Sequence, residues 1–408
     1  MMNLEIPEKF RSLTEQARVV ADSVFRPISR KYDTLEHAYP KELDVLAALL
    51  DGLNEAGAGA SVRSVSKDAT TEANGDGAAV KKTKNGGNIA AVLGMMELAR
   101  GDVGLALTIP RQGLGNAAVM AVGTKEQREK FGKMWIAMAI TEPNAGSDSA
   151  AIRTSARLDG EEWVLNGEKI FVTAGERAGA VVVWATLDPG LGRAAIKSFV
   201  VPKGTPGLRV VRLDHKLGIR ASDTATLVLE DCRVPKDNIL GNAEIDTKKA
   251  FAGVMKTFDN TRPLVAAMGV GVARAALERV REVLARNGVP IRDERSLAQA
   301  SALDVELTRL EAEVEVARLL TLKAAWMADN GKPNSLEASM AKAKAGRVVN
   351  EVTLKCVEIA GSAGYDEGDL LEKWARDSKI LDIFEGTQQI QMLIVARQLL
   401  GKTSAELR

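Results

Sequence analysis

Near both ends of this chain, apolar residues recur at three- and four-residue spacing, which is the spacing of helices that bury one face. Between these helical parts, short runs alternate apolar and polar positions and are separated by Gly and Pro, as strands joined by turns are. The pattern predicts helices first, strands next and long helices last, over 6–135, 138–240, 261–287, 296–330 and 335–361. Two shorter helices should flank Glu385.

The alternating segment contains two dipeptides, Asp159-Gly160 and Asn166-Gly167, that suit hairpin turns with positive φ. With the helical parts on either side, it indicates an α+β protein of three domains. We expect an N-terminal helical domain over 1–137, a middle antiparallel β domain over 138–243 and a C-terminal helical bundle over 244–408. The Gly-, Thr- and Lys-rich stretch 58–87 is expected to be a long loop.

The charge of the chain is almost balanced, with 55 Lys and Arg against 54 Asp and Glu among 408 residues. This balance gives no electrostatic reason to expect nucleic acid or an anionic membrane as a partner. No apolar run has the length of a membrane span. The first residues include acidic side chains and lack the apolar region of a signal peptide. We therefore expect a cytoplasmic protein.

Cysteine and histidine are scarce. Cys232 and Cys356 lie far apart without a CxxC spacing, so we expect two structural thiols rather than a disulfide or a zinc cluster. His37 and His215 do not form a pair at metal-ligand spacing, so no metal site is expected. The chemistry of this chain should therefore depend on carboxylates, backbone groups or a cofactor.

Glu385 stands between two apolar helical segments, at a joint marked by Gly386. Thr387 is a candidate N-cap, whose hydroxyl would accept a hydrogen bond from the first turn of the next helix. One interpretation is a solvated carboxylate that favours the helix N-terminus. The other is a general base, because an apolar neighbourhood raises the pKa of a carboxyl group toward the range useful for proton abstraction. The segment alone favours the first interpretation.

Two segments of the β domain could hold a ligand. The loop 139–148 offers backbone amides and the hydroxyls of Thr141 and Ser147 to a flat heterocycle or a phosphate. An ordinary turn has a similar composition. In a regular strand, Phe171 and Thr173 would share one face and could flank a flat ring, although a half-buried strand end is the commoner case.

Asp259 and Arg262 lie three residues apart where a helix is expected to start, near Pro263. At this spacing they could bind one ligand jointly or pair with each other on the surface. A surface ion pair is the simpler expectation.

Taken together, these segments resemble one family, the flavin-dependent acyl-CoA dehydrogenases, over nearly the whole chain and in the same order. The resemblance is carried by ELARGDVGLAL, GTKEQREKF, AITEPNAGSD, NGEKIFVTAG, KLGIRASDTATLVLEDCRVPKDNILG, ARDSKI and FEGTQQIQ. It implies an acyl-CoA dehydrogenase-like fold: an N-terminal helical domain, a middle β domain and a C-terminal bundle, with FAD held between the last two. These are the three domains that the pattern predicts.

The resemblance also implies a role for each residue that matches a family motif. Glu385 would be the catalytic base. The residues expected at FAD are Met138, Ala139, Ile140, Thr141, Ser147, Phe171, Val172, Thr173, Glu358, Gly361, Ser362, Thr387 and Gln389. The residues expected at the acyl-CoA substrate are Ser147, Asp259, Arg262 and Gly386.

The implied reaction converts an acyl-CoA thioester to the trans-2-enoyl-CoA, as in fatty acid β-oxidation. The carboxylate would take the α-proton while the flavin accepts a hydride from the β-carbon. In the family, the flavin ribityl chain and the backbone amide of the base bond to the thioester carbonyl, where they stabilise enolate charge. Glu385→Gln should therefore retain flavin and lose most turnover.

The chain departs from the family pattern on the adenosine side of FAD. Asn287-Gly288 stands where Phe-Gly is expected, so Arg281, Arg286 and Arg292 are equal candidates for the pyrophosphate arginine. Glu358 replaces a Gln and Ser362 replaces a Gly. A carboxylate at this place would oppose the pyrophosphate charge unless it is paired or turned away.

These departures leave alternatives for the assembly and the chemistry. We expect a homotetramer that passes electrons to an electron-transfer flavoprotein. An acyl-CoA oxidase, or a flavin-poor subunit of a hetero-oligomer, would also fit. The length and branching of the acyl group are not determined by the sequence.

Overall fold

The computed structural model describes residues 6–47, 86–110, 113–245, 252–291, 296, 298–403 and 406, with the backbone alone over 252–260. Most of the stretch expected to be a long loop, 58–87, lies outside these residues. The chain forms two compact units. We call them the helical unit, made of Met1–Asp33, Val45–Ala106 and Arg262–Arg408, and the β unit, made of Thr34–Asp44 and Leu107–Thr261.

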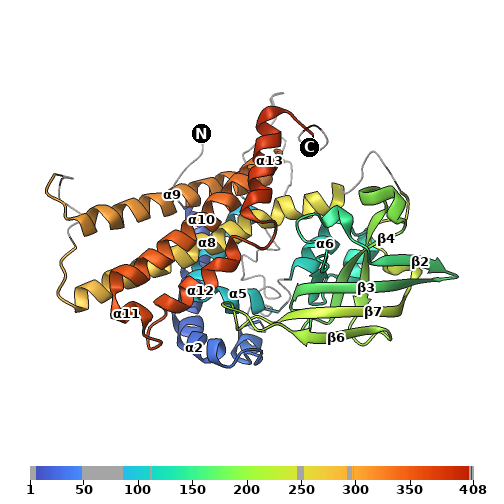
Figure 1. Ribbon diagram of the computed structural model, residues 1–408, viewed down its shortest axis with the longest axis horizontal. Coiled ribbons are helices and arrows are strands. Elements are labelled where there is room, and N and C mark those ends of the chain that lie inside the picture. The colour runs from blue at the N-terminus through green and yellow to red at the C-terminus, as the bar shows by residue number, and fades with distance from the viewer. Residues whose placement is uncertain are drawn as a thin grey trace, which may run out of the picture. The chain divides into compact units, whose positions relative to one another are not determined.

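The helical unit combines helices from both ends of the sequence. Its longer helices are α1 (Arg11–Val20), α4 (Gly87–Gly101), α9 (Ala302–Asp329), α10 (Ser335–Ala360), α12 (Leu371–Leu381), α13 (Gln388–Leu400) and most of α8 (Ala252–Arg286). Helix α10 packs against α9, α12 and α13 (Figure 1). Helix α4 packs against α1 and α9. The N-terminal α1 and α4 therefore share a core with the C-terminal bundle. The helical unit also contains most of α2 (Arg26–Thr34), the one-turn α11 (Ser362–Tyr365) and part of α5 (Val103–Thr108).

Local signals set several helix ends. Helix α9 begins with a capping box, in which Ser301 and Asp304 each accept a hydrogen bond from the other's backbone amide. Helix α8 ends at Asn287-Gly288, where Gly288 takes a φ of 71°. The expected start of this helix near Thr261 is wrong: α8 begins at Ala252, which places Pro263 inside it.

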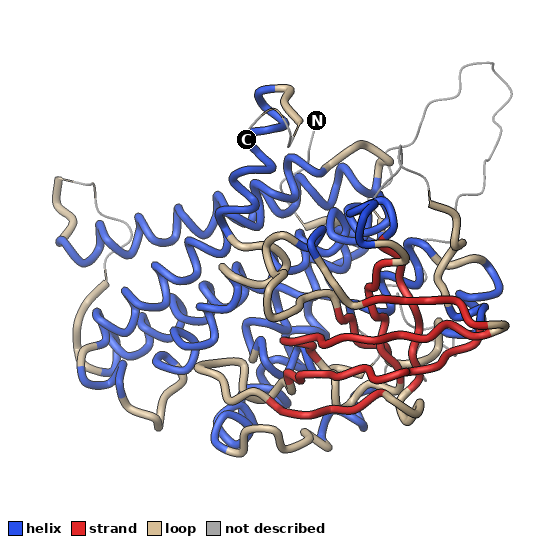
Figure 2. Tube along the Cα trace, turned by 45° about the vertical axis from the view of Figure 1, so that its right-hand side comes forward, coloured by secondary structure: helices blue, strands red, loops and turns tan. Residues whose placement is uncertain are grey.

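The β unit contains a seven-stranded sheet in the order β1-β4-β2-β3-β7-β6, with β5 paired to β4. Figure 2 shows the strands together in red. The strands are β1 (Ile136–Ala139), β2 (Ser155–Asp159), β3 (Glu162–Thr173), β4 (Ala180–Thr186), β5 (Ile196–Pro202), β6 (Leu208–Leu213) and β7 (Thr224–Pro235). The middle β domain is confirmed, but its sheet is mixed, because β1 pairs with β4 in parallel. The predicted limits 1–137, 138–243 and 244–408 stay a prediction.

One of the two expected hairpins forms. Asp159 ends β2 and pairs with Glu162 of β3, and the two residues between them include Gly160, which has the positive φ that the turn needs. Asn166-Gly167 does not make a turn; it lies inside β3, where the pairing register with β7 shifts. A side chain at Gly167 would meet Thr154 Oγ1 at 2.4 Å, so the glycine permits a close approach of two segments.

Strand β4 lies between two apolar clusters. Val181 and Val183 belong to the cluster shared with β3 and β7. Val182 and Trp184 point into the other cluster, together with Val119 of α6 (Leu114–Val122) and Phe131 of α7 (Lys125–Phe131). Because both faces of β4 are buried, the strand lacks the polar alternation of a solvent-facing strand. Among the described residues, no helix combines the length and the apolar character that a membrane span requires.

Candidate active site

The loop after β1 is fixed by a buried ion pair. Glu142 accepts hydrogen bonds from the backbone amides of Arg153 (2.6 Å) and Thr154 (2.9 Å), and its carboxylate lies 2.7 Å from Lys169 Nζ. Burial lowers the pKa of Lys169 to about 8, although Glu142 acts in the opposite direction. Burial would raise the pKa of Glu142, but its hydrogen bonds and the ammonium group of Lys169 lower it overall. These contacts hold the loop while Ser147 stays exposed.

Phe171 interrupts the regular course of β3. Its φ is 58°, and the register with β7 shifts between Lys169 and Val172. The Phe171 side chain is 62% exposed, whereas Val172 is buried. The expectation that Phe171 and Thr173 share a face assumed a regular strand, and the bulge removes that assumption. The result is still an exposed aromatic ring close to a half-buried threonine.

The loop and the bulge lie side by side within the β unit. The Ile170 amide donates a hydrogen bond to Thr141 O at 2.9 Å. The structure thus brings together the residues of this unit that were expected at FAD: Met138, Ala139, Ile140, Thr141, Ser147, Phe171, Val172 and Thr173. An exposed ring in a strained backbone, beside exposed loop residues, fits a flat ligand such as the isoalloxazine of FAD.

In the helical unit, Glu385 occupies the sharp turn between α12 and α13. Its φ is 53°, and that of Gly386 is 90°. The buried Gln391 side chain donates hydrogen bonds to Glu385 O (2.9 Å) and Gly386 O (3.2 Å). The φ of 90° favours glycine at position 386, and a side chain there would also displace Gln391 Nε2, which lies 2.6 Å from the place of its Cβ. The predicted N-cap is confirmed, since Thr387 Oγ1 accepts from the Ile390 amide.

Lys342 is the second residue that holds this turn. From α10, its buried ammonium group donates a hydrogen bond to Gly386 O at 2.7 Å. Burial lowers the pKa of Lys342 to about 8; the charges of Asp382 and Glu385 oppose this shift and that of Arg262 adds to it. A cation therefore lies within electrostatic reach of the Glu385 carboxylate.

Arg262 is only 3% exposed, so the expectation of a surface ion pair is wrong for this residue. Asp259 lies on the same helix, in the part described by backbone alone. A buried guanidinium group near Lys342 concentrates positive charge in this part of the helical unit, which suits an anionic ligand.

Glu358, which was expected near the adenosine part of FAD, pairs on the surface with Lys355 at 2.9 Å. The Glu358 carboxylate is therefore paired, which is one of the two conditions under which it would not oppose the pyrophosphate charge. Gly361 ends α10 with a φ of 61°, and Ser362 begins α11.

The candidate arginines for the pyrophosphate are mostly engaged elsewhere. Arg281 pairs with Glu311 at 2.7 Å, and Arg286 lies 3.8 Å from Asp369. Arg292 lies outside the described residues. The geometry therefore assigns no arginine to the pyrophosphate.

Sequence reasoning missed Lys342 and Gln391. One signal for Lys342 was present: in SMAKAKAG, this lysine stands among alanines at helical spacing, on a face that should be apolar. Gln391 is the last residue of the motif FEGTQQIQ, but the sequence did not indicate that its side chain bonds to the turn that precedes it.

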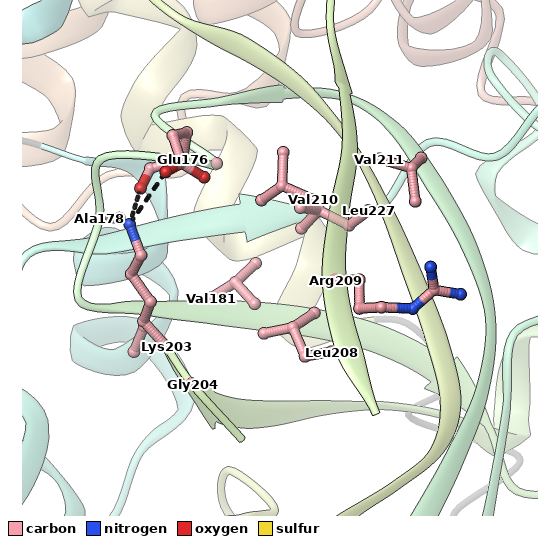
Figure 3. A pocket seen from close by; sticks show the side chains of 12 residues that line it. Glu176, Ala178, Val181, Lys203, Gly204, Leu208, Arg209, Val210, Val211 and Leu227 are labelled. Atoms are coloured by element: carbon pink, nitrogen blue, oxygen red, sulfur yellow. Dashed lines mark hydrogen bonds and ion pairs between the residues drawn. The ribbon is translucent and has the colours of Figure 1, made fainter. Parts of the chain in front are cut away.

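A cavity of about 560 Å³ lies elsewhere in the β unit. It is lined mainly by apolar residues of β4, β6 and β7, with Lys203 and Glu176 paired at one side (Figure 3). None of the residues expected at the active site lines it, so we do not assign it to the reaction.

Comparison with known proteins gives consistent matches. Two domain families match this chain: "Acyl-CoA dehydrogenase, middle domain" over residues 137–232 and "Acyl-CoA dehydrogenase, C-terminal domain" over residues 251–400. The mitochondrial short-chain specific acyl-CoA dehydrogenase of Bos taurus is 34% identical, over 98% of this chain and 92% of that protein. The acryloyl-CoA reductase (NADH) of Anaerotignum propionicum is 32% identical, over 98% of this chain and 97% of that protein. The solved structure of butyryl-CoA dehydrogenase from Megasphaera elsdenii matches with a TM-score of 0.83 and 29% identity, over 98% of this chain and 100% of that one.

Proposed function

Because this chain belongs to the acyl-CoA dehydrogenase family, we propose that it oxidises a short-chain acyl-CoA thioester to the trans-2-enoyl-CoA, with Glu385 as the base. The chain is an enzyme of the acyl-CoA dehydrogenase type. The short-chain assignment is supported by the Bos taurus and Megasphaera elsdenii relatives, which are named for short acyl groups.

The observation that carries the proposal is the geometry of the Glu385 turn. The left-handed backbone of Glu385 is held by Gln391, and that of the adjoining Gly386 by Lys342, so the carboxylate starts from a fixed backbone position. Proton abstraction needs such a fixed position, because a small displacement of a base strongly reduces its rate. The solvated interpretation of Glu385 explains neither the strained backbone nor the buried lysine.

The family depends on FAD, and the exposed ring of Phe171 beside the loop 139–148 supports binding of its flavin. From the β unit, the residues that would hold FAD are those of this loop and of the bulge. From the helical unit, they are Thr387 and Gln389, with Glu358, Gly361 and Ser362 on the adenosine side. When bound, FAD supplies the acceptor for the β-hydride.

The chain's own groups would carry the remaining steps. The Glu385 carboxylate takes the α-proton, and its backbone amide donates a hydrogen bond to the thioester carbonyl, where negative charge develops. Lys342 keeps the turn in place and favours the ionised carboxylate before each turnover. Asp259, Arg262, Ser147 and Gly386 would contact the acyl-CoA.

For the assembly, the proposal includes a homotetramer in the cytoplasm that passes electrons to an electron-transfer flavoprotein. The oxidase and the flavin-poor partner subunit remain alternatives. The acryloyl-CoA reductase relative adds the reverse direction as an outcome to be tested.

The test is an anaerobic titration of the purified chain with acyl-CoA thioesters of increasing length, followed in the visible spectrum of bound flavin. Bleaching by butyryl-CoA at lower concentrations than by long-chain thioesters supports the proposal. Reoxidation of the bleached protein by air at the rate of turnover would instead indicate an oxidase. Bleaching by NADH, with reoxidation by a short 2-enoyl-CoA, would indicate a reductase. A chain that takes up no FAD would be a partner subunit.

A further inference from the structure

The two histidines of this chain, which the sequence places far apart, meet in the β unit. His37 lies in the segment that follows α2, and His215 lies in the connection between β6 and β7. Their ring centroids are 5.1 Å apart. Glu36 completes the group. We call Glu36, His37 and His215 the histidine cluster.

The donor atoms of the histidine cluster converge. His215 Nδ1 and Glu36 Oε2 are 2.9 Å apart, and one ligand atom from each of the three residues lies within 4.8 Å of the others. The other carboxylate oxygen, Glu36 Oε1, accepts a hydrogen bond from the Lys216 amide at 2.8 Å, which orients the carboxylate. Two imidazoles and one oriented carboxylate form a ligand set that zinc accepts in proteins.

His37 is the member that structural packing explains least. Its φ is 69°, and both of its ring nitrogens are buried without a hydrogen-bond partner in the described part of the chain. An imidazole whose two nitrogens are buried without a hydrogen bond loses the bonds that it makes in water.

The neighbouring cations donate hydrogen bonds to backbone carbonyl groups, and one of them, Arg177, donates to His37 O itself at 3.3 Å. Lys216 Nζ donates a hydrogen bond to Ser222 O (2.7 Å), and Arg177 donates to Ala221 O (2.8 Å) and Ala38 O (2.9 Å). Arg177 also lies 3.4 Å from Asp223. Glu36, Asp214 and Asp223 offset the charges of Lys216, Arg177 and Arg212, which lies 2.8 Å from Asp214, so a divalent ion would not meet a large excess of positive charge.

We propose that Glu36, His37 and His215 bind one zinc ion, with water in the remaining coordination position. Donor atoms around tetrahedral zinc lie roughly 3.3 Å apart, since the bonds are about 2.0–2.2 Å long. The 2.9 Å between His215 Nδ1 and Glu36 Oε2 must therefore lengthen, and the widest separation in the cluster, which is within 4.8 Å, must shorten. The His215 side chain is 84% exposed, so it is free to rotate inward and leaves one side of the site open to water.

Zinc at this position would act as a cross-link. It would join the segment Thr34–Asp44 to the connection between β6 and β7, and both belong to the β unit. The role would thus be structural, because the histidine cluster contains none of the residues proposed for the dehydrogenation.

The experiment uses the full chain with its flavin, freed of metal by a chelator and dialysed at pH 7. Calorimetric titration with zinc chloride should give one zinc per chain. Cobalt in place of zinc should give the visible absorption bands of a four-coordinate site. Zinc should also raise the melting temperature.

Three variants test the ligands. His37→Asn keeps a residue that tolerates positive φ, and His215→Gln and Glu36→Gln keep similar size. Each should weaken zinc binding at least tenfold and abolish the thermal shift, while the circular dichroism spectrum is unchanged. Glu161→Gln, which removes an exposed carboxylate at the β2–β3 hairpin, is the matched control and should bind zinc like the parent chain.

Two results would overturn the proposal. One is a parent chain that takes up no zinc under these conditions. The other is zinc uptake that all three variants retain at parent affinity, which would place the ion elsewhere.

Discussion

Glu385 and Phe171 both have a left-handed backbone, which for residues with a side chain is unfavourable by roughly 1–2 kcal/mol. Each is held by a contact from another segment: Gln391 bonds to Glu385 O, and the amide beside Phe171 bonds to Thr141 O. Strained residues persist where surrounding contacts determine them, and they are frequent at functional sites. Both residues were expected at the active site on the basis of family motifs. Their strain is independent support for that expectation.

Replacing Glu385 with Gln tests the base directly. The amide is nearly isosteric and cannot accept the α-proton. We expect turnover to fall by at least about 100-fold, the lower end of the range for general bases, while flavin content stays unchanged. Stopped-flow measurement of flavin bleaching by butyryl-CoA gives the rate. Comparable bleaching in Glu385→Gln would remove Glu385 from this role.

Replacing Lys342 with Met tests the group that holds the turn. We expect kcat to fall by roughly 10-fold to 100-fold, because the base is no longer held in position. The parent enzyme should also lose activity as the pH rises through about 8, where Lys342 loses its proton. An ordinary lysine would stay charged up to a pH near 10.5.

The pH profile of kcat between pH 6 and 10 checks this prediction. The fall in kcat near pH 8 should be absent in Lys342→Met. If kcat of this variant still falls near pH 8 as in the parent enzyme, another group titrates there. Circular dichroism serves as the control for folding.

At the scale of elements, hydrophobic periodicity and local turn chemistry predicted most helices and strands. The errors occur where a local signal has two structural meanings. Asn166-Gly167 suits a turn, but it forms part of a strand because Thr154 packs closely against Gly167. Pro263 suits a helix start, but its helix begins at Ala252. In each case the local signal alone does not decide which structure forms.

The two N-caps of α13 and α9 provide a matched pair of tests. Thr387→Ala and Ser301→Ala each remove a hydroxyl that caps a helix, and each should destabilise the protein by about 1 kcal/mol. Only Thr387→Ala should also reduce turnover, because Thr387 adjoins the Glu385 turn. Urea denaturation and steady-state kinetics measure the two effects. Equal kinetic losses in both variants would indicate a general loss of stability.

At the scale of the whole molecule, the helical unit depends on charges buried between distant segments. Lys373 Nζ lies 2.7 Å from Asp102 and 2.6 Å from Asp377, and Ser29 donates a hydrogen bond to Asp102. Burial alone would lower the pKa of Lys373, but the two carboxylates raise it well above its ordinary value. The lysine is therefore charged at every physiological pH.

Lys373→Met would leave two carboxylates buried without their cation. We expect a loss of about 3–5 kcal/mol in the free energy of unfolding, measured by urea denaturation. The surface pair of Lys355 with Glu358 is the control, and Lys355→Met should leave the denaturation midpoint unchanged. A Lys373→Met protein as stable as the parent would show that the network is replaceable by apolar packing.

The sequence by itself determined the order of helical and β segments, the joint at Glu385 and the cap at Thr387. These features depend on interactions between residues close along the chain, and such interactions leave a periodic or local pattern. The motifs that indicated the family are of the same kind, because they are short and continuous. Lys342 stands out in its helix only as an unexplained charge.

Only the tertiary structure decided which distant residues meet. It brought Lys342 to Gly386, Lys169 to Glu142, Lys373 to Asp102, and His37 to His215. The spacing of residues along a chain carries no information about which segments will pack against each other. The physical reason is that burial of apolar faces selects the packing, and the charged groups are then paired by the positions that packing gives them.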